Sequence, residues 1–351
     1  MIEPPLVDVL VPAYNHEEFV AQALDSILMQ SIDAPFQITV LEDFSTDATR
    51  SIVQRYASTH PEIIRLRLNE HNLNNGRSMM AAIEQSRATY IAVLEGDDYW
   101  VSADKLQKQV DLLDQHADCA FAHHNFHVVY DDGRASHLKH PPGQQGFSSI
   151  HDMFRSNFVS TCSTMYRRSS LQAIPEWFCD ALVGDWPLHL LAARSGRIAY
   201  IDEPMATYRI HAGGLWSKMS PVAQAETTVT ILKQMFGQFE PEYYADIRNG
   251  LANGYRDLAN AQAAAGDHEG ANRSHEAHVD ALSDVLSELW KQRASTEDKL
   301  RTNVALLRAS QAALAATEAE LQGLVSSRSW RATRSLRVAA AALRKISRPR
   351  Q

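Results

Sequence analysis

The run Tyr90-Ile91-Ala92-Val93-Leu94-Glu95-Gly96-Asp97-Asp98 decides how this chain of 351 residues folds. Its first five residues are apolar or aromatic, and a short unbroken run of this kind fits a strand buried on both faces of a sheet. The acidic residues that follow end the strand. Ligands of open α/β sheets bind beyond the carboxyl ends of the strands, so this acidic run is the first candidate for a functional site.

The segments before this run repeat one plan, in which an apolar stretch is followed by an amphipathic stretch of helical period. The apolar stretches are Val7–Val11, Gln37–Leu41 and Ile63–Leu68. Such alternation is typical of a mostly parallel sheet with flanking helices, so we predict an α/β, Rossmann-like domain. The elements expected after the acidic run are a helix at 104–116, a strand at Cys119–Tyr130, a helix at Trp186–Ser195 and strands at Ile198–Ile201 and Met205–Arg209.

The composition changes from about Pro221 onward, where Ala, Gln, Glu and Leu dominate. Leu251–Leu282 reads as two helices around Gly266–Asp267. A heptad spacing that predicts a short coiled coil follows at Leu300, Val304, Leu307, Leu314, Leu321 and Val325. We therefore predict an α/β domain at 1–220, a helical region at 221–290, a coiled-coil segment at 291–325 that can self-associate, and a basic amphipathic tail at 326–351.

Charge is distributed unevenly along the chain. The formal net charge is −8, but residues 326–351 hold seven Arg and one Lys without an acidic residue, which leaves 26 basic against 42 acidic residues elsewhere. We expect an acidic body and a tail that binds an anionic surface. Because no apolar run is long enough to span a membrane and no signal segment is seen, we expect a cytoplasmic protein, peripheral on the inner face of the plasma membrane.

Composition excludes several classes of protein. Apolar residues make up 45% and charged residues 22%, which is typical of a globular chain and not of a disordered or collagen-like one. Cys119, Cys162 and Cys179 are odd in number and form no CxxC pair, so we expect reduced thiols in the core rather than a disulfide framework. His123 and its neighbour His124 would lie on opposite faces of a strand, which favours packing over a metal site.

Three polar clusters follow three predicted strands and should converge at one edge of the sheet: Tyr14–Asn15, Glu42–Asp43 and Asp97–Asp98. No GxxxxGK[ST] loop and no GxGxxG after the first strand is present to bind phosphate. Adjacent carboxylates can instead hold Mg²⁺ or Mn²⁺, which bridges the oxygens of a diphosphate. Asp43 can accept an N–H from a nucleotide base, because an ionised carboxylate only accepts hydrogen bonds.

These segments resemble, in order and spacing, the family 2 glycosyltransferases of the GT-A fold. The resemblance covers roughly residues 5 to 215 and is carried by Val11–Asn15, Glu42–Asp47, Asn72–Gly76, Glu95–Trp100, Gly184–Trp186 and Tyr208–Gly214. The short segment Ser329–Arg334 also looks like the tails of bacterial cell-surface polysaccharide transferases.

The resemblance implies a role for each matching residue. The nucleotide and donor site would comprise Pro12, Ala13, Tyr14, Asn15, Glu42, Asp43, Arg77, Glu95, Asp97, Asp98 and Arg209. The metal ligands would be Asp97, Asp98 and His211, with Asp97 first, since Glu95 stands where the first Asp of the family's DxD element usually is. Asp185 matches the general base, although Gly184 replaces one member of the usual acidic pair. Capping of the following helix is the alternative for Asp185.

The predicted function is therefore inverting, metal-dependent transfer of a sugar from a nucleotide-sugar donor to a hydroxyl of a saccharide or lipid-linked acceptor. A cell-surface polysaccharide such as O-antigen, lipopolysaccharide or exopolysaccharide is the expected product. One alternative is a nucleotidyltransferase that makes nucleotide sugars, although its glycine-rich basic loop is missing. The other is a non-catalytic scaffold that uses the coiled coil and the basic tail. No nucleic-acid partner is expected.

Overall fold

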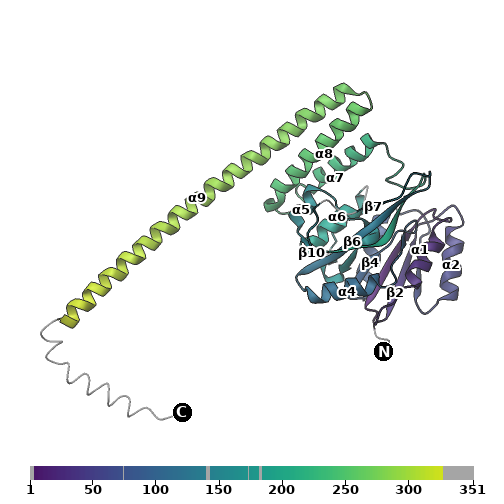
Figure 1. Ribbon diagram of the computed structural model, residues 1–351, viewed down its shortest axis with the longest axis horizontal. Coiled ribbons are helices and arrows are strands. Elements are labelled where there is room, and N and C mark those ends of the chain that lie inside the picture. Colours follow the sequence, from purple (N-terminus) through teal and green to yellow (C-terminus); the bar gives the residue numbers. More distant parts are fainter. Residues whose placement is uncertain (1–3, 74, 140–142, 173, 182–183, 327–351) are drawn as a thin grey trace, which may run out of the picture. The chain divides into compact units, whose positions relative to one another are not determined.

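The structure is a computed structural model that describes residues 4–73, 75–139, 143–172, 174–181 and 184–326. The chain divides into two compact units, Met1–Val285 and Leu286–Gln351. All strands of the described residues lie in the first unit (Figure 1). The second unit contributes helix, and its basic tail from residue 327 onward lies outside the described residues.

A single mixed sheet of ten strands organises the first unit. Its strands are β1 (Val7–Ala13), β2 (Phe36–Glu42), β3 (Ile64–Leu68), β4 (Tyr90–Val93), β5 (Tyr99–Trp100), β6 (Cys119–Tyr130), β7 (His137–Lys139), β8 (Phe147–Ser148), β9 (Met165–Arg167) and β10 (Arg197–Ile210). The order across the sheet is β3-β2-β1-β4-β9-β6-β10-β5, with β7 beside β6 and β8 beside β10. Strands β1 to β4 pair in parallel, and β9 pairs antiparallel with both neighbours. The predicted mostly parallel α/β sheet is confirmed.

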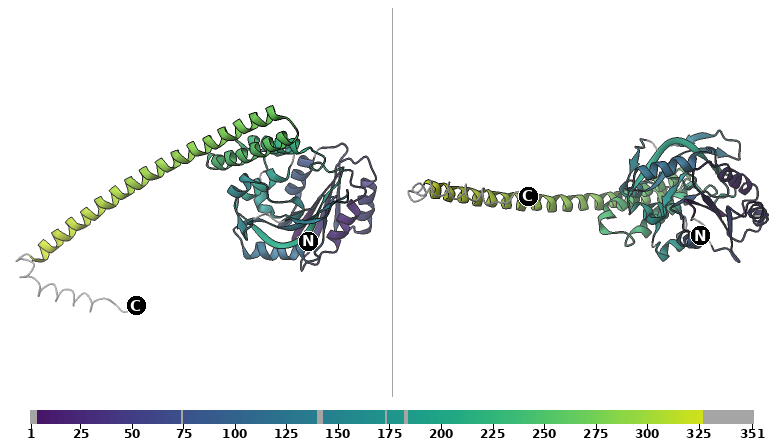
Figure 2. Two further views of the ribbon diagram at one scale, coloured as in Figure 1. Left: turned by 45° about the horizontal axis from the view of Figure 1, so that its top comes forward. Right: turned by 90° about the horizontal axis from the view of Figure 1, so that it is seen from below.

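Helices cover both faces of this sheet (Figure 2). They are α1 (Val20–Leu28), α2 (Thr49–Thr59), α3 (Asn75–Gln85), α4 (Lys105–Gln115), α5 (Ile150–Arg155), α6 (Asp185–Ala193), α7 (Pro221–Met235), α8 (Tyr244–Ala264) and α9 (His268–Ser326). Because side chains alternate along a strand, β1 contributes to two cores. Val9 and Val11 pack with α1, α2 and α4, whereas Leu10 packs with α3 and α6.

The carboxyl ends of β1, β2 and β4 are joined by backbone hydrogen bonds. The Gly96 amide donates to the Pro12 carbonyl at 2.9 Å, and the Asp43 amide donates to the Ala13 carbonyl at 3.0 Å. Gly96 has a steric reason to lack a side chain, because a Cβ there would lie 2.8 Å from His16 Nδ1. The three predicted polar clusters therefore meet at one edge of the sheet.

The later part of the sheet differs from the prediction. We expected two strands at Ile198–Ile201 and Met205–Arg209, but β10 is one strand of 14 residues. Its pairing with β6 shifts register on both sides of Pro204, which has no amide hydrogen to donate to the ladder. Strand β9, which is inserted between β4 and β6, was not predicted, since its three residues carry no periodic signal.

The helical region after Pro221 begins within the first unit. Helix α7 packs beside α8, and α8 packs on α5, where a Cβ at Gly250 would lie 2.2 Å from the Phe154 carbonyl oxygen. Gly266 has a φ of +84° between α8 and α9, so the predicted helix pair around Gly266–Asp267 is confirmed. Across the described residues, no helix is long and apolar enough to cross a membrane.

Candidate active site

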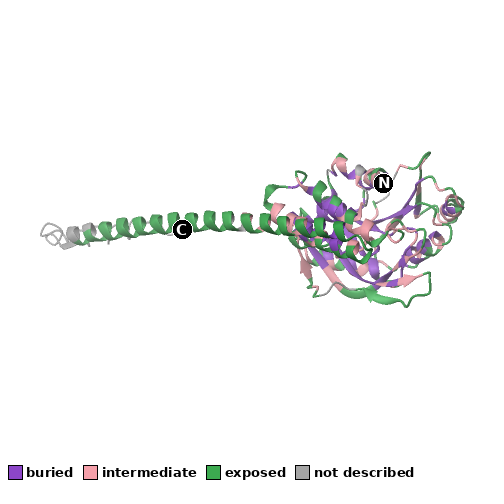
Figure 3. Ribbon diagram, turned by 90° about the horizontal axis from the view of Figure 1, so that it is seen from above, coloured by how far each residue is buried: buried purple, intermediate pink, exposed green. Residues whose placement is uncertain are grey.

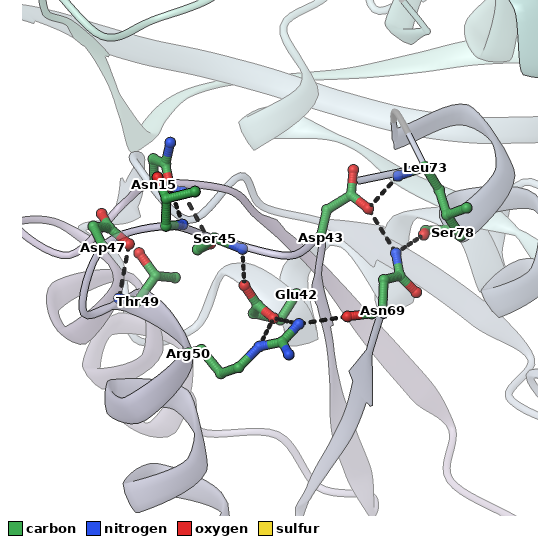
Figure 4. Close-up of polar contacts among 11 residues, drawn as sticks. Asn15, Glu42, Asp43, Ser45, Asp47, Thr49, Arg50, Asn69, Leu73 and Ser78 are labelled. Carbon is green, nitrogen blue, oxygen red and sulfur yellow. Dashed lines mark hydrogen bonds and ion pairs between the residues drawn. The ribbon is translucent and has the colours of Figure 1, made fainter. Parts of the chain in front are cut away.

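The turn after β1 is built around Asn15, which has a φ of 55° in the left-handed region that Asn tolerates better than most residues. Its amide donates to Ser45 Oγ at 3.1 Å, and its Oδ1 accepts from the Thr46 amide at 2.8 Å. The next amide, of His16, donates to Thr49 Oγ1 at 2.7 Å. The loops after β1 and β2 therefore form one hydrogen-bonded rim (Figure 4).

Glu42 and Asp43 are neighbours with different surroundings. Both are buried, at 0% and 1% exposure, but Glu42 forms an ion pair with Arg50 and accepts from the Ser45 amide at 2.6 Å. Asp43 Oδ1 accepts from Asn69 Nδ2 at 2.7 Å and from the Leu73 amide at 2.8 Å (Figure 4). Both of these bonds use the same oxygen. The Asp43 carboxylate is thus oriented, and its Oδ2 has no partner among the described residues. Both oxygens of the Glu42 carboxylate, by contrast, bind groups of the protein itself.

Asp97 lies between two imidazoles. His211 Nε2 is 3.0 Å from Asp97 Oδ2, and His16 Nε2 is 3.6 Å from the same oxygen. Burial opposes ionisation of this carboxyl, but the His211 hydrogen bond and the charges of His16 and His211 outweigh burial, so the pKa of Asp97 lies below its usual range. Asp97 is therefore an ionised carboxylate, 18% exposed, next to a second metal-ligating type of side chain.

Arg209 lies near the end of β10 and binds the acidic turn that contains Asp97 and Asp98. Its Nη1 donates to the Asp97 carbonyl and its Nη2 to Gln22 Oε1, both at 2.7 Å. The guanidinium carbon lies 4.5 Å from the centre of the Phe19 ring. The Arg209 amide donates to Asp98 Oδ1 at 2.8 Å. Arg209 thus contributes positive charge in a nearly buried position and fixes the acidic turn through its backbone.

Of the remaining carboxylates of the cluster, Asp98 lies deeper than Asp97, whereas Glu95 is partly buried, as Asp97 is. Asp98 is 2% exposed, and burial together with the charges of Asp97 and Glu95 raises its pKa well above the usual range. Burial and the charges of Asp97 and Asp185 raise the pKa of Glu95 to about 8. The charge of Asp97 acts on both of these carboxyls, so the three side chains form one electrostatic unit, and such clusters are frequent at functional sites.

Asp185 is the first residue of α6 and belongs to the same unit through its charge on Glu95. Burial raises its pKa, while hydrogen bonds from the Trp186 amide at 2.7 Å and Asn157 Nδ2 at 3.3 Å partly oppose that rise. Gly184 holds the N-cap position, and no side-chain cap bond is formed there. Asp185 nevertheless accepts from a first-turn amide of α6, so helix capping stays an alternative beside the role of general base.

The structure does not bring every predicted residue equally close to the acidic cluster. Arg77 is half exposed on α3, and its Nη1 lies 3.4 Å from Glu176 Oε1. Pro12 and Ala13 contribute backbone carbonyls to the strand-end hydrogen bonds, and Tyr14 is 38% exposed beside them. These placements leave the roles expected for the four residues as predictions.

Sequence reasoning missed several residues of the site, namely His16, Gln22, Asn69 and Asn157. His16 directly follows the turn residues Tyr14–Asn15, so its position in the motif was a usable signal. Gln22 and Asn157 reach the site from an ordinary helix and an irregular segment, and no sequence pattern marks them. Their roles depend on tertiary contacts.

No preformed metal cluster accompanies the site. Within the described part of the chain, no group of three or more His, Cys, Asp or Glu side chains is arranged to hold a metal ion. Mg²⁺ and similar ions are often bound by one or two carboxylates together with substrate phosphates. Asp97 supplies one such carboxylate, and His211 Nε2 lies 3.0 Å from its Oδ2.

Two solved structures share this fold and were determined with nucleotide ligands. TarS 1-349 of Staphylococcus aureus in complex with UDP has a TM-score of 0.54 at 18% identity, over 78% of this chain and 91% of that one. The mannosyltransferase PcManGT of Pyrobaculum calidifontis, in complex with GDP-Man and Mn²⁺, has a TM-score of 0.53 at 17% identity, over 99% and 88%. At these identities the likeness shows the GT-A fold, as predicted.

Sequence comparison gives the family. The model described as Glycosyl transferase family 2 matches residues 8–174. The putative teichuronic acid biosynthesis glycosyltransferase TuaG of Bacillus subtilis is 33% identical over 212 residues, which cover 59% of this chain and 79% of TuaG. The uncharacterized protein Rv1520 of Mycobacterium tuberculosis is 36% identical over 205 residues, and the match spans 58% of the length of each. The chain belongs to glycosyl transferase family 2.

Proposed function

We propose that this protein is an inverting, metal-dependent glycosyltransferase that moves a sugar from a nucleotide-sugar donor to a hydroxyl acceptor. The observation that carries the proposal is the meeting of Asn15, Asp43 and Asp97 at the carboxyl ends of adjacent strands β1, β2 and β4. Family membership and the nucleotide complexes of TarS and PcManGT support it.

The donor nucleotide would bind on the rim formed by the loops after β1 and β2. Asp43 is held by Asn69 and the Leu73 amide through Oδ1, so Oδ2 can accept an N–H of the base. Glu42, by contrast, holds Arg50 and the Ser45 amide and so shapes the loop without touching the donor. The Asp43 carboxylate would thus bind the base, and the neighbouring Glu42 carboxylate would stabilise the loop that forms the rim.

The donor diphosphate would lie next to Asp97 and His211, which we assign as the protein ligands of Mg²⁺ or Mn²⁺. When bound, such an ion stabilises the negative charge that a nucleoside diphosphate gains as it leaves the sugar. Asp98, predicted as a further ligand, is buried and accepts from the Arg209 amide, so we assign it to holding Arg209 in place. Arg209 adds a fixed positive charge on the same side of the site.

Asp185 would act as the general base. Its partly buried carboxylate is oriented by Asn157 and the Trp186 amide, and its raised pKa makes it a stronger proton acceptor than an exposed Asp. Asp185 would take the proton of the acceptor hydroxyl as that oxygen attacks C1 of the sugar. A single attack from the face opposite the diphosphate inverts the anomeric configuration, and no protein nucleophile is needed.

The acceptor would be a saccharide or lipid-linked saccharide of a cell-surface polysaccharide. TuaG is named for the biosynthesis of teichuronic acid, which supports this class of product. The body carries a formal charge of −16 and residues 326–351 a charge of +8. We propose that these basic residues hold the enzyme on the inner face of an anionic membrane, where lipid-linked acceptors are available.

A panel of nucleotide sugars tests the function. Ligands that bind only the native state raise its melting temperature, so thermal unfolding of the full chain is followed with UDP- and GDP-sugars, with Mn²⁺ or with EDTA. One donor should stabilise the chain only with Mn²⁺, and incubation with acceptors should then release a nucleoside diphosphate. Release of pyrophosphate from nucleoside triphosphates, without any donor effect, would instead identify a nucleotidyltransferase and refute the proposal.

A further inference from the structure

The second unit presents a stripe of large apolar side chains along α9. Leu286, Trp290, Leu300 and Val304 are 57%, 64%, 63% and 39% exposed. Figure 3 shows this part of α9 green along nearly its whole described length. Together with residues 293 and 297, these residues are spaced alternately four and three positions apart along the helix. This spacing is the a/d repeat of a helix that packs against another helix.

The centre of the stripe is charged. Arg293 and Glu297 occupy the two a/d positions between Trp290 and Leu300, and Arg293 Nε donates to Glu297 Oε1 of the same helix at 2.8 Å. The Arg293 guanidinium carbon lies 5.4 Å from the centre of the Trp290 ring. Both charged side chains are more than half exposed, at 65% and 51%. A partner helix must therefore match one positive and one negative residue at adjacent positions.

The direction of pairing decides whether those charges match. In a parallel, in-register pair of identical helices, each a or d residue faces its own copy, so Arg293 would face Arg293 and Glu297 would face Glu297. In an antiparallel pair centred on Ser295, Arg293 faces Glu297 of the second copy, and the reverse contact forms as well. Like charges placed opposite each other are unfavourable, and opposite charges also fix register.

The same antiparallel register matches the apolar residues. On either side of the charged centre, Trp290 faces Leu300, and Leu286 faces Val304, each twice by symmetry. Ala294, next to the centre, is small and uncharged, so the two helices can approach closely there. Over residues 286–304, which span about 28 Å of helix, charge and apolar pattern thus agree on one arrangement. The exposed Leu307 and Leu314 continue the repeat beyond this segment.

We infer that residues 286–304 of α9 pair antiparallel with the same residues of a second copy of this chain. The occupant of the stripe is therefore another copy rather than a different protein or a lipid surface. The interface is self-complementary, as expected for a two-fold dimer. This inference does not depend on the catalytic proposal.

Charge reversal tests the inference on the full-length chain, with the mass in solution measured by sedimentation equilibrium. Arg293→Glu or Glu297→Arg alone should weaken the dimer by about tenfold or more, because like charges then oppose each other. The double variant Arg293→Glu with Glu297→Arg should restore the wild-type dissociation constant to within about threefold, since the pairs are re-formed. Arg301→Glu, outside the a/d positions, is the control and should have a much smaller effect.

Disulfide formation tests the direction. A disulfide needs Cα atoms less than about 7 Å apart. Trp290→Cys and Leu300→Cys chains should cross-link with each other when mixed, and neither should cross-link when alone, because the two copies of residue 300 would lie about 15 Å apart along the pair. Cross-linking of Leu300→Cys alone would show a parallel pair. A chain that stays monomeric at every concentration would overturn the inference as well, whatever covers the stripe.

Discussion

At the scale of single residues, the chemistry of the site depends on which carboxylates remain free for ligands. Asp97 and Asp185 have different surroundings, one between two imidazoles and the other beside an amide side chain. The first is held ionised, and the pKa of the second is raised by burial. This difference in pKa suits Asp97 to binding a cation and Asp185 to accepting a proton.

Asp185→Asn should slow catalysis without weakening donor binding. The amide keeps the size of the carboxylate but cannot accept the acceptor's proton, and loss of a general base costs about 10²- to 10⁴-fold in rate. Single-turnover release of nucleoside diphosphate measures the rate, and calorimetry measures the donor affinity. A variant that keeps the wild-type kcat would remove Asp185 from the mechanism.

The neighbours Glu42 and Asp43 should respond to mutation in opposite ways. Glu42→Gln removes the buried carboxylate of an ion pair whose Arg50 is 31% exposed, so we expect a loss of stability of about 1 to 3 kcal/mol with little change in nucleotide affinity per folded molecule. Asp43→Asn can keep the Asn69 contact but presents an amide to the base, so nucleotide affinity should fall by about tenfold with smaller loss of stability. Urea unfolding and calorimetry separate the two effects, and equal responses would contradict the assignment.

At the scale of elements, the β6–α6 contact buries two histidines without charge. The His123 ring packs at a tilt against the rings of Phe158 and Tyr200, and His189 Nδ1 lies 2.7 Å from the Tyr166 hydroxyl. Burial lowers the pKa of each to about 3. The unfolded chain therefore binds more protons than the native one below pH 6.5, so stability is lost as pH falls from 6.5 toward 3.

Replacement of one of these histidines should reduce the sensitivity to acid. Each buried histidine should lower the free energy of unfolding at pH 5.0 by on the order of 2 kcal/mol relative to pH 7.5, because one pKa unit corresponds to about 1.4 kcal/mol. His123→Phe should shrink the difference in unfolding free energy between the two pH values by about that amount, as measured by urea unfolding. The exposed His268→Gln is the control. An unchanged difference in His123→Phe would show that His123 is not held neutral.

The elements also show which parts of the fold a sequence can specify. Strands β1, β2 and β4 were predictable because each is a mainly apolar run that is followed by polar residues, and their convergence follows from parallel pairing. Strand β9 and the two-residue β5 and β8 were not, since so few residues have no periodicity to detect. The two strands expected at Ile198–Ile201 and Met205–Arg209 are one strand, β10, in which the sheet accommodates Pro204 by a shift in register.

The same limit applies to the site. Residues next to strand ends, such as Asp43 and Asp97, were predictable because the strand places them. The deep position of Asp98 and the ion pair that consumes Glu42 depend on Arg209 and Arg50, which approach from other segments. No spacing in the sequence encodes those contacts, so only the structure separates residues that can meet a ligand from residues that hold the loop.

At the scale of the whole molecule, the uneven charge predicts attachment to membranes. The full chain should bind vesicles that contain anionic lipid, and affinity should fall steeply with added salt. Replacement of the eight basic side chains of residues 326–351 by Gln should abolish binding, while neutral vesicles serve as the control. Vesicle flotation measures the bound fraction. Equal affinity for DNA would show that these residues bind any polyanion, against the proposed attachment.

Binding of UDP and GDP, measured by isothermal titration calorimetry with Mn²⁺ and with EDTA, tests the central claim most directly. We predict that the wild-type chain binds one of them at least about tenfold more tightly with Mn²⁺, that Asp97→Asn loses this difference, and that Asp132→Asn, on an exposed turn, keeps it. If neither nucleotide binds the wild-type chain, or if Asp97→Asn responds to Mn²⁺ as the wild type does, the strand-end site is not the metal-assisted nucleotide site described above.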